Sequence, residues 1–307
     1  MKVQSNFKIF LNIFFQGLGA MLAFVFSLIV TNKLIPLSPE IRAAADSASG
    51  FLTMPLAFLF NAAANALILV WVGRRSSFKG PALVGQLFVF SFGAQTLQTQ
   101  IETGYFLPAF PLLHNNFELY VLIFRGFTIS LLFSLLVTWI VGGFSKMSRS
   151  QSAFTITTDI AVKYSSWLPV VYLTLYMLFG YFVAWQVKEL RLFYGGPAEL
   201  NGFFEQWGLT LMQKPELPFF QFFRGALWIL CLIPLFRGFL GKRVELVILS
   251  AIALALLPTA QLAFANPLMP AGVSLGHFWE VSISTGIFGA LCAWFIPKPR
   301  DTNLPVV

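Results

Sequence analysis

Residues 9–30 read IFLNIFFQGLGAMLAFVFSLIV and contain no charged side chain. A helix needs about 20 mostly apolar residues to cross the hydrocarbon core of a bilayer, so this stretch is long enough to span a membrane. The apolar core of a cleaved signal peptide is shorter, about 7–15 residues, and a small-x-small cleavage site follows it. We therefore expect the stretch to be kept as the first membrane helix.

The composition of the whole chain also indicates a membrane protein. Its 307 residues are 57% hydrophobic and only 10% charged, whereas about a quarter of the residues in a soluble domain are charged. The net charge of +8 would suggest nucleic acid in a soluble protein, but the Lys and Arg excess of cytoplasmic loops explains it here. We expect the lipid bilayer as a partner and no nucleic acid. Cys231 and Cys292 lie in apolar stretches and do not form a disulfide framework.

Eight segments of the chain qualify as membrane helices. They are approximately residues 9–31, 51–73, 81–99, 119–142, 167–187, 218–237, 244–264 and 276–296. The third is the least clear, because Gln86, Gln95 and Gln98 interrupt it. No connection is long enough for a soluble domain, so the expected fold is a single membrane domain over residues 1–307. Its class is all-α transmembrane, an eight-helix bundle.

Lys and Arg are distributed unevenly between the two sides that eight spans define. One side collects thirteen of the twenty, namely Lys2, Lys8, Arg74, Arg75, Lys79, Lys146, Arg149, Lys163, Arg237, Lys242, Arg243, Lys298 and Arg300. The other side collects five, namely Lys33, Arg42, Lys188, Arg191 and Lys214. Because cytoplasmic loops are enriched in Lys and Arg, this asymmetry predicts that both termini are cytoplasmic.

The two halves of the chain share a pattern. The eighth predicted span can be laid over the fourth at a fixed offset of 155 residues, which matches Arg125 with Glu280 and Trp139 with Trp294. This predicts a 4+4 parallel internal repeat, with residues 1–145 as the first four-helix half and residues 164–300 as the second. Chance similarity among apolar helices is the alternative. Because four spans is an even number, both halves have the same orientation and their axis runs along the membrane normal.

Arg125 and Arg224 are the only basic residues well inside predicted spans. Each lies about seven residues from the outer end of its span, roughly 10 Å deep at 1.5 Å per residue. A cation at that depth is costly, so each is expected to face the bundle interior and find a partner. His277, Glu280 and Ser284 share one helix face near the same depth. The sequence thus predicts that Glu280 pairs with Arg125 or Arg224.

Further polar side chains come from the outer ends of neighbouring spans, and three interpretations of the cluster remain open. It fixes the packing of a non-catalytic scaffold or complex subunit, it binds a small solute or ion for transport, or it holds an intramembrane catalytic site. We favour solute binding, because intramembrane ionisable residues mark pathways. The candidate residues are Arg125, Arg224, His277, Glu280, Gln95, Gln261 and Glu102. Two guanidiniums against one carboxylate leave a positive charge, which Glu102 offsets or an anionic solute fills.

Motifs that identify an enzyme are absent from the sequence. There is no His-Glu-x-x-His, no Gly-x-Ser-x-Gly and no phosphate-binding glycine loop. The paired glutamates and later histidines of the intramembrane prenyl-peptide proteases are absent too. His277 and Glu280 offer two metal ligands where three or four are needed. We therefore predict no metal site, no cofactor and no catalytic residue.

The long outer loop carries an amphipathic pattern. Leu200, Phe203, Phe204, Trp207 and Leu211 recur at helical spacing, which predicts a helix that lies on the membrane surface or caps an outer cavity. Pro234 and Pro258 predict helix kinks elsewhere.

Four stretches carry a resemblance to a known family. They are residues 182–186 (FVAWQ), 192–196 (LFYGG), 223–228 (FRGALW) and 266–270 (NPLMP), followed by His277 and Glu280. The chain resembles a family of uncharacterised bacterial integral membrane proteins over most of its length, most strongly over residues 180–296. The resemblance implies a location in a bacterial inner membrane. It implies no activity and no catalytic or binding residue.

Overall fold

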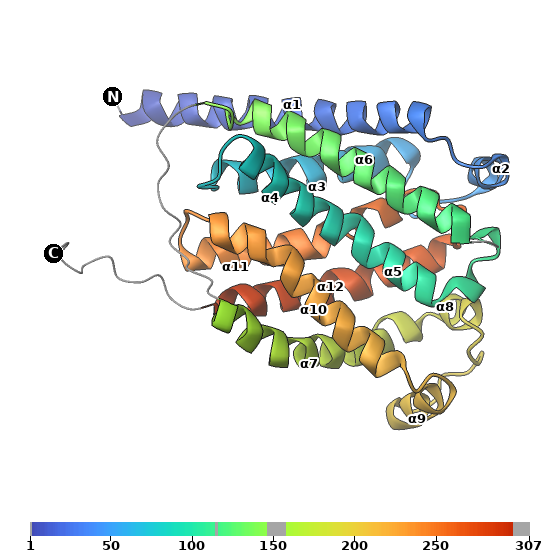
Figure 1. Ribbon diagram of the computed structural model, residues 1–307. Helices are drawn as coiled ribbons and strands as arrows, with labels where there is room; N and C mark the ends of the chain where they lie inside the picture. The colour runs from blue at the N-terminus through green and yellow to red at the C-terminus, as the bar shows by residue number, and fades with distance from the viewer. Residues whose placement is uncertain (1, 114–115, 146–157, 297–307) are drawn as a thin grey trace.

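The computed structural model describes residues 2–113, 116–145 and 158–296, and within these ranges the chain is helical and has no β-sheet (Figure 1). Six helices contain segments long and apolar enough to cross a membrane. They are α1 (Lys2–Leu34), α3 (Met54–Arg74), α6 (Asn116–Ile140), α7 (Thr158–Phe182), α10 (Leu217–Gly238) and α12 (Ala271–Phe295). The expected all-helical fold is confirmed, and six such helices are compatible with a multi-pass membrane protein. Lys146, Arg149, Lys298 and Arg300, used above to predict orientation, lie outside the described residues.

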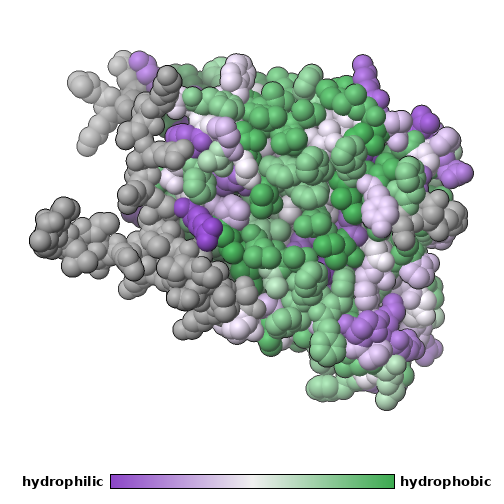
Figure 2. All heavy atoms as spheres, viewed as in Figure 1, coloured by the Kyte–Doolittle hydropathy of each residue, from purple (hydrophilic) through white to green (hydrophobic). Residues whose placement is uncertain are grey.

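The surface of the helix bundle is strongly apolar along its middle. Figure 2 shows hydrophobic side chains over the centre of the view and polar ones concentrated toward the ends of the helices. On α1, Phe10 is 62% exposed and Leu22 is 64% exposed, and on α6 Trp139 is 72% exposed. Water would make an apolar surface of this extent unfavourable, whereas lipid tails solvate it.

The third predicted span is a helix with an interruption. It begins as α4 (Pro81–Phe92), passes through a π-helical turn, η1 (Gly93–Leu97), and continues as α5 (Gln98–Tyr105). A π-turn is wider than an α-helical turn, so it changes the direction in which the following side chains point. The neighbours fit closely around it, because a Cβ at Gly93 would overlap Cys231 Sγ and one at Gly126 would overlap Thr96. Close packing of small residues is typical of membrane helix interfaces.

The seventh predicted span is also interrupted. Helix α11 (Arg243–Leu256) ends shortly before Pro258 and is followed by a 3-10 turn, η5 (Ala260–Ala263). Proline lacks the N–H that an α-helix needs, and its ring clashes with the preceding turn, so the expected kink at Pro258 is a helix end. Pro234, by contrast, lies inside α10 without ending it.

Three helix contacts recur in the two halves of the chain. In the first half α1 packs against α3 and α6, and α4 packs against α6. In the second half α7 packs against α10 and α12, and α11 packs against α12. In the first half α3 also packs against α4 and α6. Among the contacts that join the halves are those of α4 with α10 and of α3 with α11. If the helices are numbered by half, these two contacts are equivalent, since each pairs the second helix of one half with the third of the other.

The loops that follow the second helix of each half also meet. Ser76 and Phe239 form an antiparallel bridge. The Ser77 amide donates to the Gly238 carbonyl at 2.7 Å, and the Leu240 amide donates to the Arg75 carbonyl at 2.8 Å. These loops satisfy each other's backbone groups at the junction of the two halves.

Short helices gather at the opposite end of the bundle, which we call the α9 end. Figure 1 places there α2 (Pro39–Ser47), α8 (Lys188–Phe193) and α9 (Phe203–Gln213). The amphipathic helix expected near residues 200–211 is α9. Its Phe204 is 86% exposed and its Met212 is 83% exposed, whereas Gln206 is buried. Gln206, Trp207 and Thr210 line a cavity, so α9 caps that cavity as well as exposing an apolar edge.

Candidate functional site

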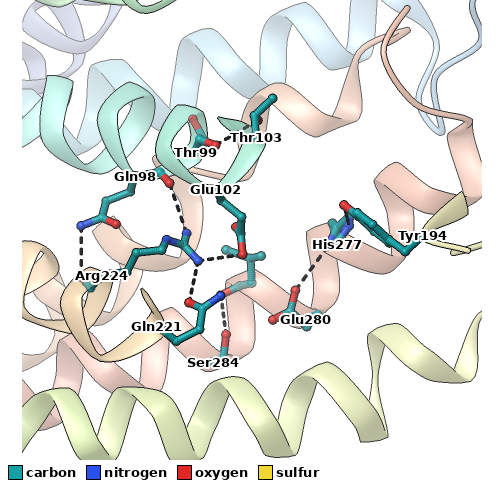
Figure 3. A network of polar contacts seen from close by, with 11 residues as sticks. Gln98, Thr99, Glu102, Thr103, Tyr194, Gln221, Arg224, His277, Glu280 and Ser284 are labelled. Carbon is teal, nitrogen blue, oxygen red and sulfur yellow. Dashed lines mark hydrogen bonds and ion pairs between the residues drawn. The ribbon is translucent and has the colours of Figure 1, made fainter. Parts of the chain in front are cut away.

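Arg224 lies in the second turn of α10 and is almost wholly buried, with 4% of its side chain exposed. Its Nη1 donates to Glu102 Oε1 at 2.7 Å and to Gln221 Oε1 at 2.9 Å, and its Nη2 donates to the Gln98 carbonyl at 3.2 Å. The Gln98 amide in turn donates to the Arg224 carbonyl at 3.3 Å (Figure 3). A buried cation needs a carboxylate and several acceptors to offset its lost hydration, and Arg224 has both.

The π-turn and the length of α5 place Glu102 against Arg224. Gln98 and Glu102 are four residues apart, so they lie on one face of α5. Helix α5 extends the third span beyond residue 99, where the sequence suggested its end, and this brings Glu102 to the level of Arg224. Single π-turns are frequent at functional sites.

A second set of polar contacts links α8 to α12. The hydroxyl of Tyr194 lies 2.9 Å from His277 Nε2, and His277 Nδ1 lies 3.4 Å from Glu280 Oε2 (Figure 3). The Glu280 side chain is only 7% exposed and that of His277 is 21% exposed. Residues three apart on a helix face the same side, which explains how α12 presents both groups together.

The protonation state of Tyr194, which lies in a loop after α8, bears on the direction of these hydrogen bonds. Burial raises the pKa of Tyr194 well above its usual value, and the nearby Glu102 and Glu280 carboxylates raise it further. The phenol therefore keeps its proton and is able to donate it to His277 Nε2. In the tautomer that accepts this bond the imidazole carries its proton on Nδ1, from which it donates to Glu280.

Two cavities of about 300 Å³ each meet at these side chains. Glu102, Phe106, Tyr194 and His277 line both of them. The first cavity lies beneath α9 and also reaches Glu280. The second cavity also reaches Arg224, Trp228 and Gln261. We refer to Glu102, Arg224, His277 and Glu280 as the polar cluster. Each of its members lines at least one cavity.

Gln95 and Gln261 connect the two interrupted spans. Gln261 Nε2 donates to the Gln95 carbonyl at 3.3 Å and to the Pro258 carbonyl at 3.2 Å. Gln261 lines the second cavity, whereas Gln95 is buried and lines neither. Of the two stretches of irregular backbone, the one near residues 258–263 therefore lines the second cavity, through Pro258, Gln261 and Leu262, and Gln261 connects it to the π-turn at residues 93–97.

The expected pairing of Glu280 with an arginine is wrong. Among the described residues, the ion pairs of these groups join Arg224 to Glu102 and His277 to Glu280. Of the two ways in which the expected surplus of positive charge could be met, the structure has the first, since Glu102 pairs with Arg224. The polar cluster has two carboxylates and one guanidinium, and that guanidinium is already paired.

Arg125 does not join the cluster. Its guanidinium donates to the Ile35 carbonyl and to Asn32 Oδ1 at the end of α1, and it lines neither cavity. Carbonyl and amide oxygens near the edge of the membrane are sufficient partners for an arginine with a long, flexible stem. Arg125 and Arg224 have the same predicted depth in two different helices, but an equal depth did not bring Arg125 to the polar cluster.

Tyr194, Gln98 and Gln221 contribute to the site but were not among the candidates. Tyr194 lies in the predicted long outer loop, and only the fold shows that it contacts His277. Gln221 lies three residues before Arg224 on the same helix, and this spacing was a usable signal for a supporting acceptor.

The cluster lacks the ligands of a metal centre. Within the part of the chain that the structure describes, no three His, Cys, Asp or Glu side chains are grouped so as to hold a metal ion. Comparisons with protein-family models, curated proteins and solved structures find no match to the chain. The functional argument therefore depends on the geometry of the cluster and its cavities.

Proposed function

We propose that this protein is a carrier in the bacterial inner membrane that binds a small solute in the two cavities around Glu102, Arg224, His277 and Glu280. The observation that supports this most is the position of the cavities. They meet at four ionisable side chains that lie in or beside membrane-spanning helices. Such residues are costly to bury, so they are retained where a solute or ion pathway needs them.

The proposed topology has eight spans with both termini in the cytoplasm. Six spans are the long helices. The other two are residues 81–105, which comprise α4, η1 and α5, and residues 243–263, which comprise α11 and η5. Both lengths fall within the range of about 17–25 residues that suits a bilayer. The α9 end is then extracytoplasmic, because the basic-rich loops lie at the other end.

The proposed architecture is a 4+4 repeat. The same helix neighbours in each half, and the equivalent contacts of α4 with α10 and α3 with α11, support it. The mutual pairing of the loops at Ser76 and Phe239 is what a twofold axis passing between them would produce. In this arrangement the interrupted spans, third and seventh, are equivalent.

Interrupted helices in corresponding positions of two repeats are characteristic of transporter binding sites. Here the second interruption lines the second cavity through Pro258 and Gln261, and Gln261 bonds it to the first. Within the described residues two buried donors next to that cavity have no acceptor, namely Arg224 Nε and Trp228 Nε1. Irregular backbone and unsatisfied donors inside a membrane protein are tolerated where they face a solute or water.

Exchange of solutes in proteoliposomes tests the proposal. The purified chain is reconstituted and loaded with an ammonium, a zwitterionic, a neutral or an anionic solute, and counterflow of the radiolabelled compound is measured. We expect the wild type to exchange at least one class and Arg224→Gln to exchange none. Glu118→Gln, a carboxylate variant at the start of α6 that lines neither cavity, is expected to match the wild type.

A scaffold role is the alternative that a specific observation favours, since Arg224 is well paired and could simply hold α5 to α10. A scaffold would exchange no solute class. An intramembrane enzyme is a third possibility, for which the described residues supply no group of three metal ligands.

A further inference from the structure

Six aromatic side chains line the first cavity. They are Tyr176, Tyr181, Trp185, Tyr194, Trp207 and Phe106. The faces of aromatic rings carry partial negative charge and attract cations, and Trp does so most strongly. A wall of this composition, enclosing about 300 Å³, suits a small organic cation.

Two carboxylates face the same cavity, and each is only partly satisfied. Glu102 uses Oε1 for Arg224, and Glu280 uses Oε2 for His277. Within the described ranges no hydrogen-bond donor lies on Glu102 Oε2 or Glu280 Oε1. Glu280 is only 5% exposed and lines the cavity, so a donor from a ligand there would offset part of its lost hydration.

The chain already places one ammonium on this wall. Lys214 Nζ lies 4.5 Å from the centre of the Phe106 ring and 5.9 Å from that of Tyr105. It forms no ion pair with Glu102 or Glu280 among the described residues. The aromatic wall is therefore able to hold an ammonium, and Glu280, which no arginine or lysine pairs within those residues, is the carboxylate left for a second one.

Two tryptophans offer hydrogen-bond donors for a polar group at the other end of such a ligand. Trp185 and Trp207 line the first cavity, and their buried indole N–H groups have no acceptor in the described part of the chain. An oxygen on the ligand would satisfy one or both of them.

We propose that the first cavity binds a small amine that also carries a hydrogen-bond-accepting oxygen, as in an amino alcohol. The ammonium lies between Glu280, Glu102 and the aromatic faces, and the oxygen accepts from Trp185 or Trp207. This inference rests on the proposed carrier function and names its substrate class. It replaces the anion that a surplus of arginine had suggested.

Isothermal titration calorimetry on the purified full-length chain in detergent tests the inference. The probes are choline, ethanolamine, acetate and 3,3-dimethylbutan-1-ol, which is a neutral isostere of choline. We expect choline or ethanolamine to bind, and the neutral isostere and acetate to bind at least about tenfold more weakly, because they lose the charge-assisted contacts.

Substitutions of two residues that line the first cavity test whether the amine binds there. Glu280→Gln and Trp207→Leu are each expected to raise the Kd about tenfold or more, the first by removing charge and the second by removing an aromatic face. Glu118→Gln is expected to leave the Kd unchanged. Should Glu280→Gln fail to fold, Trp207→Leu carries the test alone.

The results of the calorimetry distinguish a failure of the amine proposal from a failure of the proposed carrier function. Binding of acetate or of the neutral alcohol without binding of either amine overturns the amine inference and leaves a solute carrier in place. Binding of no probe also overturns the amine inference, and the counterflow measurement then decides the carrier function separately. Amine binding that Glu280→Gln and Trp207→Leu both leave unchanged places the amine elsewhere and overturns the assignment to this cavity.

Discussion

Arg224 depends on Glu102 for charge neutralisation, since its other acceptors are a side-chain amide and a backbone carbonyl. Glu102→Gln leaves the guanidinium buried without a counter-charge. Breaking a dry buried pair costs about 3–5 kcal/mol, and the Glu102 side chain is 29% exposed, so we expect a loss of about 2–3 kcal/mol. Reversible denaturation in mixed detergent micelles measures it.

Glu280→Gln serves as the comparison. Its partner is His277, and a glutamine oxygen still accepts from the imidazole N–H, so we expect a loss below about 1 kcal/mol. If Glu280→Gln were instead the more destabilising of the two substitutions, the pairing of Arg224 with Glu102 would be wrong.

The candidate residues of the polar cluster were predictable from sequence, but their partners were not. Arg224 and Glu280 stood out because charged groups are rare inside membrane spans. Glu102 appeared to lie beyond the third span, and its approach to Arg224 depends on a π-turn that no residue pattern announces. Arg125 had the same apparent depth and found its partners on α1 instead.

Gly93 shows how closely the interrupted third span packs against α10. An added Cβ would overlap Cys231 Sγ, so we expect Gly93→Ala to destabilise the fold by about 1–3 kcal/mol, as overpacking of a core does. Cys231→Ala removes the sulfur and is expected to restore much of that loss. Thermal unfolding of the single and double variants measures the coupling.

Gly85 provides a matched control on the same helix. No atom lies within 4 Å of a Cβ built there, and alanine is favoured over glycine in a helix interior by about 0.5–1 kcal/mol. Gly85→Ala is therefore expected to be neutral or stabilising. Equal effects of Gly85→Ala and Gly93→Ala would contradict the close approach of α4 to α10.

At the level of elements, hydropathy predicted the long helices well and the interruptions poorly. The six uninterrupted helices are the segments with the clearest apolar runs. The glutamines of the third predicted span weakened its prediction as a membrane helix. In the structure they support the site, since Gln98 bonds Arg224 and the Gln95 carbonyl accepts from Gln261. Pro258 predicted a kink, but the extent of the break depended on packing against α12 and α3.

The topology of the whole molecule is testable by cysteine labelling in intact inverted and right-side-out membrane vesicles. Both natural cysteines are buried, so the wild type supplies the unlabelled background. Glu199→Cys, in an exposed loop at the α9 end, is expected to react only from the extracytoplasmic side, and Lys242→Cys, exposed at the other end, only from the cytoplasm. The reverse pattern would contradict the orientation inferred from Lys and Arg.

A repeat with an axis along the membrane normal could be suggested from sequence, but the contacts between its helices could not. Apolar helices resemble one another by composition, so the match of Trp139 with Trp294 was weak support alone. Equivalent helix neighbours in the two halves are stronger support, because packing depends on where small and large side chains meet rather than on composition.

The central claim is that the polar cluster lies in cavities which an external solute can reach. Thr210→Cys in the first cavity and Thr103→Cys in the second, each tested in right-side-out vesicles with a membrane-impermeant charged methanethiosulfonate, measure that access most directly. The account predicts that both cysteines react from outside, while the buried Cys231 and Cys292 of the wild type remain unmodified. If neither introduced cysteine reacts until the protein is unfolded in detergent, the cavities are closed to water, and the polar cluster serves packing alone.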